Sequence, residues 1–381
     1  MSVKLLAFFD TRYRGGAEPW QPLIEAVPAS RLHMPLDRPG TLGQYDLDDP
    51  QAVANIVAFA RNAGVDGFVV DLRATESGYA TGAEPLAVQT SENFGLAFQW
   101  KNGDDAFWKA PASAEDRAAR ARALIAAIAV GTPALVGGRV MLIVERPKEL
   151  GAPAETLALL RQTAAAAGLP GLTLVAARAE DGDGKYTAQG YDSLVDPAAD
   201  EWHSCPPNNK PSGLDLLEVM AGMKDSVEYL DKFFSYALFA VARMVNREKR
   251  GKVLPRVFPA FHDWASKPNG GAIHLLNRKN GINVPCDTYL YGLFVENAML
   301  WAESHLPAGE RVVLLDSWNG WLTGSQVEPS LFDGDLVYNA TRNAIDRGRY
   351  VLQSREGAPE GGLDAATRER IALICEAAKN L

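Results

Sequence analysis

Short apolar runs alternate with amphipathic, helix-like stretches along most of the chain. Each apolar run is five to eight residues long and predicts a β-strand, residues 191–195 being the weakest case. The runs are continuous rather than alternating, which is typical of a parallel sheet covered on both faces. The predicted strands are residues 3–9, 66–73, 94–100, 139–146, 172–177, 191–195, 256–261 and 311–318.

Helical segments separate most of these strands. Asp49 and Pro50 suit the N-cap and first position of a helix, and an i, i+3, i+4, i+7 apolar stripe follows until Gly64 ends it. Ser113 with Asp116 predicts a second helix start, as a variant of the capping box. The remaining helices are predicted at residues 153–167, 225–250, 289–304, 332–347 and 365–380.

Eight strands, most of them followed by a helix, favour an α/β fold with a single (β/α)8 barrel and extended βα loops. We expect one barrel domain over residues 1–381, with residues 351–381 as a helical extension packed on the barrel. A doubly wound sheet is the alternative. However, no G-x-G-x-x-G motif follows the first strand, and Gly15 and Gly16 lie in a polar loop with no helix start behind them.

Polar or ionisable residues follow nearly every predicted strand. In a barrel the carboxyl ends of the strands converge on the face where active sites lie, so these residues are expected to lie together. Any single one of them is equally well explained as a helix cap or as a partner of loop amides. The set comprises Asp10, Asp71, Gln99, Glu145, Asp196, His262, Asp263, Asp316 and Asn319.

Aromatic residues stand near the same strand ends, among them Trp100, Trp318 and Trp321. Sugars present apolar C–H faces, so carbohydrate clefts combine aromatic rings with carboxylates and amides. Tryptophan is also a common core residue, but these rings neighbour Asp, Asn and Gly, which favours a sugar site. The candidate substrate-binding residues are Trp100, His262, Trp318, Asn319, Trp321 and Glu328.

Cleavage of a glycosidic bond requires two carboxyl groups about 5 to 10 Å apart. The catalytic candidates are the strand-end carboxylates Glu145, Asp263, Asp71 and Asp316. Glu145 and Asp263 follow the fourth and seventh strands, where many barrel glycosidases carry their pair, an argument by analogy of fold. An ion pair with neighbouring arginines explains Glu145 equally well.

The net charge, the lengths of the apolar segments and the cysteine positions exclude several classes of partner and location. A net charge of −9 argues against a nucleic-acid groove or an anionic membrane surface. No stretch approaches the about 18 apolar residues of a membrane span, and Asp10 interrupts the first apolar run too early for a signal peptide. Three widely separated cysteines, Cys205, Cys286 and Cys375, indicate no disulfide framework, so we expect a reduced cytoplasmic protein.

No metal or cofactor is predicted. His203 and Cys205 lack a second pair at zinc spacing, and residues 180–185 match only the beginning of a calcium loop. His262 and Asp263 suit a hydroxyl group better than a metal. Neither a P-loop nor a G-x-S-x-G motif occurs in the sequence.

Several segments together resemble one known family, the WbsX-like glycosyltransferases, which are also described as glycoside hydrolase family 99-like. The resemblance covers roughly residues 1–350. It implies a (β/α)8 barrel that acts on oligo- or polysaccharides, in proteins found in bacterial polysaccharide gene clusters. The segments that carry it are residues 64–73, 92–102, 136–150, 168–177, 256–264 and 312–334.

The most specific segment is DSWNGWLTGSQVEP, residues 316–329. The family usually has Asn-Ala-Trp-Asn-Glu-Trp, any residue, Glu-Gly, and then Leu- or Ile-Glu-Pro. In hydrolase relatives, which are endo-acting α-mannosidases, the resemblance implies that two glutamates of this motif carry retaining cleavage. Those glutamates fall on Gly320 and Thr323, which supply no carboxyl group. The matching residues are Trp318, Asn319, Trp321, Gly324, Glu328 and Pro329.

Loss of either catalytic carboxylate typically costs several powers of ten in rate, so the relatives' residues cannot carry their reaction here. We favour a carbohydrate-active enzyme that uses other strand-end carboxylates. A glycan-binding pseudoenzyme is the alternative. A nucleotide-sugar glycosyltransferase follows only from the family's name, because Asp181 and Asp183 have Asp-x-Asp spacing but lie in a Gly-rich turn.

Overall fold

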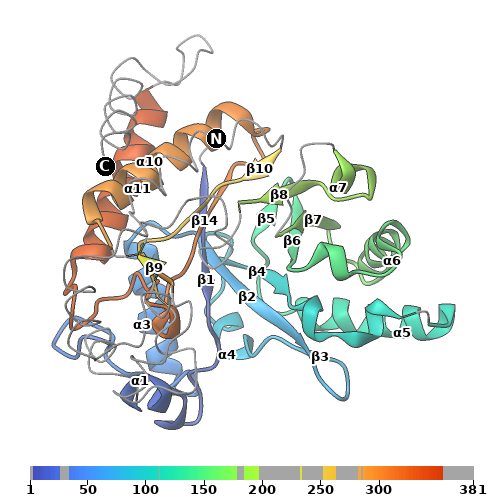
Figure 1. Cartoon of the computed structure of the whole chain (residues 1–381), viewed down its shortest axis with the longest axis horizontal. Coiled ribbons are helices and arrows are strands. Elements are labelled where there is room, and N and C mark those ends of the chain that lie inside the picture. Colours follow the sequence, from blue (N-terminus) through green and yellow to red (C-terminus); the bar gives the residue numbers. More distant parts are fainter. Residues whose placement is uncertain are drawn as a thin grey trace, which may run out of the picture.

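The computed structural model describes residues 3–25, 34–110, 112–177, 184–196, 232–233, 252–262, 282–284 and 286–354. Nine parallel strand segments form one strongly curved sheet, in the order β10-β8-β7-β6-β4-β2-β1-β14-β11 (Figure 1). They are β1 (Lys4–Phe9), β2 (Gly67–Ala74), β4 (Gly95–Trp100), β6 (Arg139–Val144), β7 (Leu172–Ala176), β8 (Ser193–Val195), β10 (Val253–Leu254), β11 (Arg256–Val257) and β14 (Val312–Leu315). Two short antiparallel strands, β3 (Tyr79–Ala80) and β5 (Leu135–Val136), extend β2 and β6.

The two ends of this sheet meet at Pro255. β10 pairs with β8, whereas β11, one residue further along the chain, pairs with β14. The Leu314 amide donates to the Pro255 carbonyl at 2.8 Å, so the interrupted strand bridges both neighbours. Taken as one strand, β10 and β11 occupy the seventh of eight positions. The predicted (β/α)8 barrel is confirmed.

The seventh strand differs from its prediction at residues 256–261. It begins earlier, at Val253, and ends at Val257, because Pro259 has no N–H group with which to continue the ladder. Residues Phe261–His262 form β12, which belongs to a separate small sheet with β13 (Ile282–Val284) and β9 (Lys232–Phe233).

The predicted helix at residues 225–250 is wrong at residues 232–233, which form β9. These two residues pair with β13, about 50 residues away in the sequence. Local helical periodicity does not reveal such a distant partner. The rest of that helix, and the predicted helix at residues 365–380, lie outside the described residues. Of the predicted extension 351–381, only residues 351–354 are described, as the end of a helix.

Helices cover the outside of the barrel (Figure 1). Asp49 caps its helix by accepting from the Gln51 amide, and Ser113 accepts from the Asp116 amide, which confirms both predicted starts. None of the described helices is long and apolar enough to cross a membrane. The longer helices are α3 (Pro50–Asn62), α5 (Ala114–Ile128), α6 (Pro153–Ala166), α10 (Thr288–His305) and α11 (Leu336–Ser354), and the short ones are α1 (Gln21–Glu25), α4 (Glu84–Ala87) and α7 (Lys185–Ala188).

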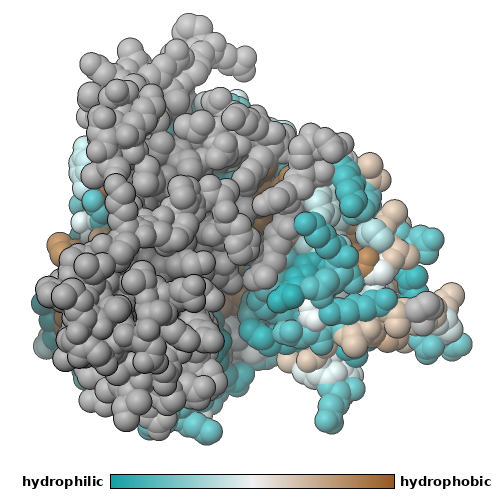
Figure 2. Space-filling model, in the orientation of Figure 1, coloured by the Kyte–Doolittle hydropathy of each residue, from teal (hydrophilic) through white to brown (hydrophobic). Residues whose placement is uncertain are grey.

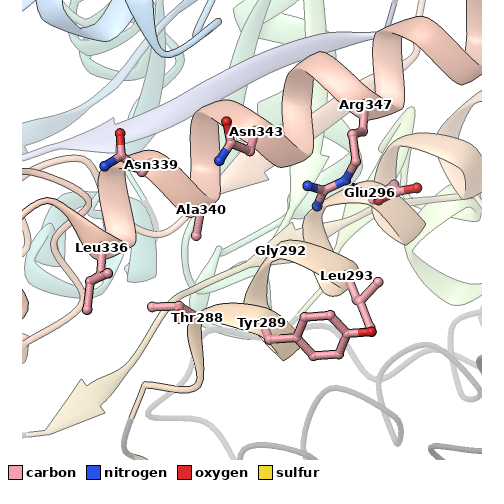
Figure 3. A pocket seen from close by; sticks show the side chains of 10 residues that line it. All are labelled: Thr288, Tyr289, Gly292, Leu293, Glu296, Leu336, Asn339, Ala340, Asn343 and Arg347. Atoms are coloured by element: carbon pink, nitrogen blue, oxygen red, sulfur yellow. Dashed lines mark hydrogen bonds and ion pairs between the residues drawn. The ribbon is translucent and has the colours of Figure 1, made fainter.

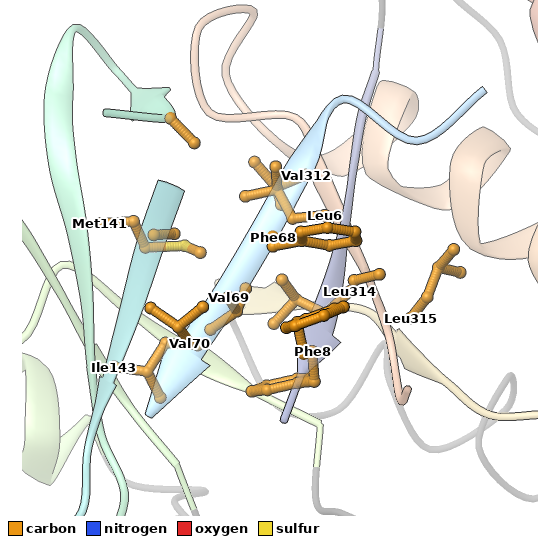
Figure 4. Packing of buried hydrophobic residues seen from close by; sticks show 14 of the residues in the cluster. Leu6, Phe8, Phe68, Val69, Val70, Met141, Ile143, Val312, Leu314 and Leu315 are labelled. Atoms are coloured by element: carbon orange, nitrogen blue, oxygen red, sulfur yellow. The ribbon is translucent and has the colours of Figure 1, made fainter. Parts of the chain in front are cut away.

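The strand register separates the barrel interior from the helix-facing surface. Phe8 pairs with Val69, and Leu6 pairs with Leu314, so these side chains share the interior (Figure 4). Phe68 points the other way, toward the helices. On the face shown in Figure 2, hydrophilic residues gather over β4 and β6, whereas the surface around α5 and α6 mixes hydrophilic and apolar residues.

Two paired glycines let β2 and β4 approach closely at their first residues. A Cβ added at Gly67 would overlap the Gly95 carbonyl, which is backbone and cannot turn aside. We therefore expect Gly67→Ala to lower the free energy of unfolding by about 3 kcal/mol or more, measured by urea denaturation. Gly309→Ala is the control, since its Cβ would meet only ordinary contacts from 3.4 Å outward. Equal stability of the two variants would contradict this account of strand packing.

Candidate functional site

Strand register brings a ring of polar side chains to the carboxyl end of the barrel. Asp71 is in register with Gln99, two positions beyond the interior residue Val69. Arg256 is in register with Leu314, which is also an interior residue. Because side chains alternate along a strand, every second residue past these points faces the same opening. We call the resulting set the mouth residues: Asp71, Gln99, Lys101, Glu145, Arg256 and Asp316.

Each carboxylate among the mouth residues has a cation partner. Lys101 forms an ion pair with Glu145, and both side chains are largely buried. The Arg256 guanidinium lies 2.7 Å from Asp316, and it also lies over the Phe8 ring, 4.3 Å from the centroid. Carboxyl groups held in this way can accept hydrogen bonds from the hydroxyl groups of a bound ligand.

Asp71 is held from two sides. Arg73 lies 2.6 Å from one carboxylate oxygen, and the Gln99 amide donates to the other at 3.4 Å. Asp71 on β2 and Glu145 after β6 flank β4, and Glu145 lies two residues beyond Ile143, which is level with Asp71, so their backbones are roughly 12 Å apart. Asp71 and Asp316 likewise flank β1. In both pairs the side chains extend toward the same opening, where their carboxyl groups can reach a bound sugar from two sides.

Trp318 packs on the helix-facing side of the barrel. Its ring contacts Phe59 of α3, Phe68 of β2 and Tyr338 of α11, and it is completely buried. It therefore presents no open face to a sugar in this structure. Its assignment as a substrate-binding residue stays a prediction on which the proposal below does not depend.

The other two predicted tryptophans are also core residues in this structure. Trp100 packs edge-on against Tyr79 and Trp108, and Trp321 packs near Trp20. Neither ring has appreciable exposed surface. Their binding roles stay predictions as well.

Asn319 holds the end of β1. Its side-chain oxygen accepts from the Asp10 amide at 2.7 Å, and its side-chain nitrogen donates to the Asp10 carbonyl at 2.9 Å. The same nitrogen donates to the Tyr45 hydroxyl at 3.0 Å. The Asp10 carboxylate itself is paired with Arg12 at 2.5 Å. Asn319 thus fixes the backbone from which Asp10 projects.

Glu328 is a buried carboxyl group behind this loop, with only 2% of its surface exposed. The Trp321 indole donates to it at 3.0 Å, and the Tyr45 hydroxyl donates to it at 3.1 Å. Burial raises the pKa of Glu328 to about 8, from an ordinary value of 4.5. Glu328 is therefore mostly protonated at neutral pH, and it joins two distant segments of the chain.

Glu328 makes a pH-dependent contribution to stability with a definite sign. Its folded pKa is raised, so the folded state binds the extra proton between pH 4.5 and 8. Its stabilising contribution is complete below pH 4.5 and is lost as the pH rises through 8. Over that window we expect the free energy of unfolding to fall by on the order of 4 kcal/mol relative to Glu328→Gln.

Urea denaturation at a series of pH values between 5 and 8 measures this difference. The exposed Glu92 offers a matched control, because Glu92→Gln is expected to follow the wild-type protein at every pH. If Glu328→Gln and the wild-type protein show the same slope against pH, the protonation assigned to Glu328 is wrong.

Gly320 stands where the family motif carries its first glutamate, and the space beside it is filled. A Cβ at this position would overlap the hydroxyl oxygens of Ser317 and Ser325 and would lie 3.1 Å from that of Thr323. The Thr323 hydroxyl lies 2.9 Å from that of Ser325. Three hydroxyl groups therefore surround the position of the missing side chain.

We expect Gly320→Ala to lower the free energy of unfolding by about 1 to 3 kcal/mol, because two hydroxyl groups have to move. In a Ser317→Ala, Ser325→Ala background the same change is expected to cost at least about 1 kcal/mol less. Thermal or urea unfolding of the four proteins completes this double-mutant cycle. Strict additivity would show that the hydroxyl groups do not limit the space at Gly320.

Two predicted residues cannot be placed. Asp263 lies outside the described residues, and of His262 only the backbone is described, in β12. Within the described ranges, no three His, Cys, Asp or Glu side chains are grouped as metal ligands would be.

Sequence reasoning missed the cations that pair with the mouth carboxylates, which are Lys101, Arg73 and Arg256. Lys101 and Arg73 each lie two residues beyond a predicted site residue, so strand alternation was an available signal. Arg256 was hidden, because the sequence predicts it at the start of its strand and the structure places it near the end.

Comparison with known proteins now identifies the family. The family model described as Glycosyltransferase WbsX matches residues 97–341, which is more than half of the chain. The chain belongs to the WbsX glycosyltransferase family. This WbsX-family protein is therefore a carbohydrate-active protein, as the resemblance in sequence implies. No curated protein matches the chain.

Solved structures agree with the barrel. A GH99 endo-alpha-mannosidase from Bacteriodes thetaiotaomicron, in complex with BIS-TRIS-Propane, superposes with a TM-score of 0.55 at 14% identity, covering 92% of this chain and 98% of that one. A protein described as glycoside hydrolase-like gives a TM-score of 0.53 at 14% identity, covering 90% and 94%. At this identity the likeness shows the fold alone.

Proposed function

We propose that this WbsX-family protein binds an oligo- or polysaccharide at the barrel mouth and cleaves or transfers a glycosidic bond there. The observation that carries the proposal is the register that turns Asp71, Glu145 and Asp316 toward one opening. Carboxylates and cations at such an opening bind sugar hydroxyls as acceptors and donors. Barrel enzymes place their reactive groups at this same end.

The proposed roles follow from the pairing of charges. Glu145, Asp71 and Asp316 each lie beside a cation and face the mouth, so they suit the base or nucleophile step. We favour Glu145 for this step, with Asp71 and Asp316 as acceptors of hydrogen bonds from sugar hydroxyls. Protonation of the leaving oxygen requires an acid, and we assign that step to Asp263, the remaining candidate from the sequence.

Partners and location complete the proposal. The net charge of −9 fits a neutral glycan better than a nucleic acid. Cys286 carries a free thiol, and burial raises its pKa to about 12. Together with the sequence features above, this supports a reduced, cytoplasmic setting, and we propose no cofactor.

A second candidate function is glycan binding without chemistry. The packing around Gly320 favours it, because Ser317, Thr323 and Ser325 fill the space that a motif glutamate would need. In that case the mouth holds a sugar by shape and hydrogen bonds alone. The two candidates differ in whether any product forms.

The test compares the wild-type protein with four variants on a panel of polysaccharides, and mass spectrometry measures the oligosaccharides released. The variants are Glu145→Gln, Asp71→Asn, Asp316→Asn and Asp263→Asn. Loss of a reacting carboxylate is expected to slow the wild-type reaction about a thousandfold or more, whereas a carboxylate that only binds hydroxyls costs far less.

Glu310→Gln is the matched control. Glu310 forms an ion pair with Lys252 and is partly buried, much like Glu145 with Lys101, but it lies just before the first residue of β14, at the opposite end of the barrel. The control is expected to keep full activity. If none of the four variants slows product release, the catalytic assignment is wrong. If the wild-type protein binds glycan but releases no product, the second candidate function holds.

A further inference from the structure

A groove of about 470 Å³ lies between α10 and α11, in the helical layer outside the barrel (Figure 3). It shares no residue with the mouth. Tyr289 and Leu293 of α10 line one side of the groove, Leu336 and Ala340 of α11 line the other, and Arg347 reaches toward Glu296 at one end. Thr288 and two asparagines also line the groove.

Two asparagine side chains in this groove have donors and acceptors that are available to a ligand. Asn339 and Asn343 are one helical turn apart on α11, so both lie on the same face of the helix. Both are exposed, and among the described residues neither amide has a hydrogen-bond partner. Each amide offers one acceptor oxygen and two N–H donors, which matches a sugar hydroxyl that both donates and accepts.

Tyr289 supplies the apolar part of the site. Its side chain is 70% exposed at the rim of the groove, where an aromatic ring is normally costly to leave in water. At the far end, Arg347 and Glu296 form an ion pair at 3.2 Å. An exposed ring, two free amides and a carboxylate–guanidinium pair form the set of groups that recognises a neutral sugar.

We propose that this groove is a second glycan-binding site, which holds a neutral polysaccharide chain away from the barrel mouth. A docked apolar helix would bury the Asn339 and Asn343 amides without partners, at a cost that sugar hydroxyls avoid. The inference deepens the proposed function, because a polymer held at the groove is presented to the mouth at a raised effective concentration.

Affinity electrophoresis tests the groove without any need for catalysis. The protein is run through native gels that contain yeast α-mannan, dextran or galactomannan, with the Glu145→Gln change present so that no polymer is cut. We expect retardation in at least one gel, and Tyr289→Ala or Asn343→Ala is expected to weaken the apparent affinity about tenfold. Tyr350→Ala is the matched control, since Tyr350 is a 73% exposed tyrosine of α11 that does not line the groove.

Three outcomes overturn the inference: no retardation of the parent protein in any gel, equal retardation of Tyr289→Ala and Tyr350→Ala, or a change of oligomeric state in Tyr289→Ala that accounts for its altered mobility. Failure of the groove inference can be told apart from failure of the proposed function at the mouth. Retardation that depends on Tyr289, together with no product release by the wild-type protein, would support the groove and contradict the chemistry at the mouth. Product release with no dependence on Tyr289 would do the reverse.

Discussion

The backbone pairing of residues 253–257 is the constraint on which the rest of the molecule depends. Half of this strand pairs with β8 and half with β14, and the change of partner occurs at Pro255. Proline lacks an N–H group but still accepts through its carbonyl, so the strand changes partner there without leaving an orphaned donor. Without this bridge the sheet would stay open, and Arg256 and Asp316 would lie at its edge rather than at a common mouth.

Closure has chemical consequences because the register of parallel strands decides which side chains meet. The same alternation that fills the interior with Phe8, Val69 and Leu314 ends in charged residues one layer higher. The charged mouth residues therefore lie directly above an apolar floor. Lys101 and Glu145 come from adjacent strands and pair there, which positions both side chains before any ligand arrives.

Much of this arrangement could be predicted from the sequence. The continuous apolar runs located the strands, and the polar residues after them located three mouth carboxylates, Asp71, Glu145 and Asp316. Prediction failed where the outcome depends on a distant partner or on the direction of a loop. Residues 232–233 take their strand conformation from pairing with β13.

The aromatic residues and Glu328 show the same limit. Trp318 lies two residues past Asp316, yet its ring packs against α3 and α11, because the loop turns it away from the mouth. The partners of Glu328 include Tyr45, 283 residues away in sequence, so its burial and raised pKa leave no local signal. In this structure Asn319 and Glu328 of the family motif hold loops together, and the predicted binding roles of its tryptophans stay predictions.

The most direct test of the account is a crystal structure of Glu145→Gln with a bound oligosaccharide from the polymer that the protein retains. We expect a sugar at the carboxyl end of the barrel, with its anomeric carbon within reach of residue 145 and its hydroxyl groups within reach of Asp71 or Asp316. A sugar bound only elsewhere on the molecule, with the mouth still occupied by the ion pairs of Asp71 and Asp316 alone, would contradict it.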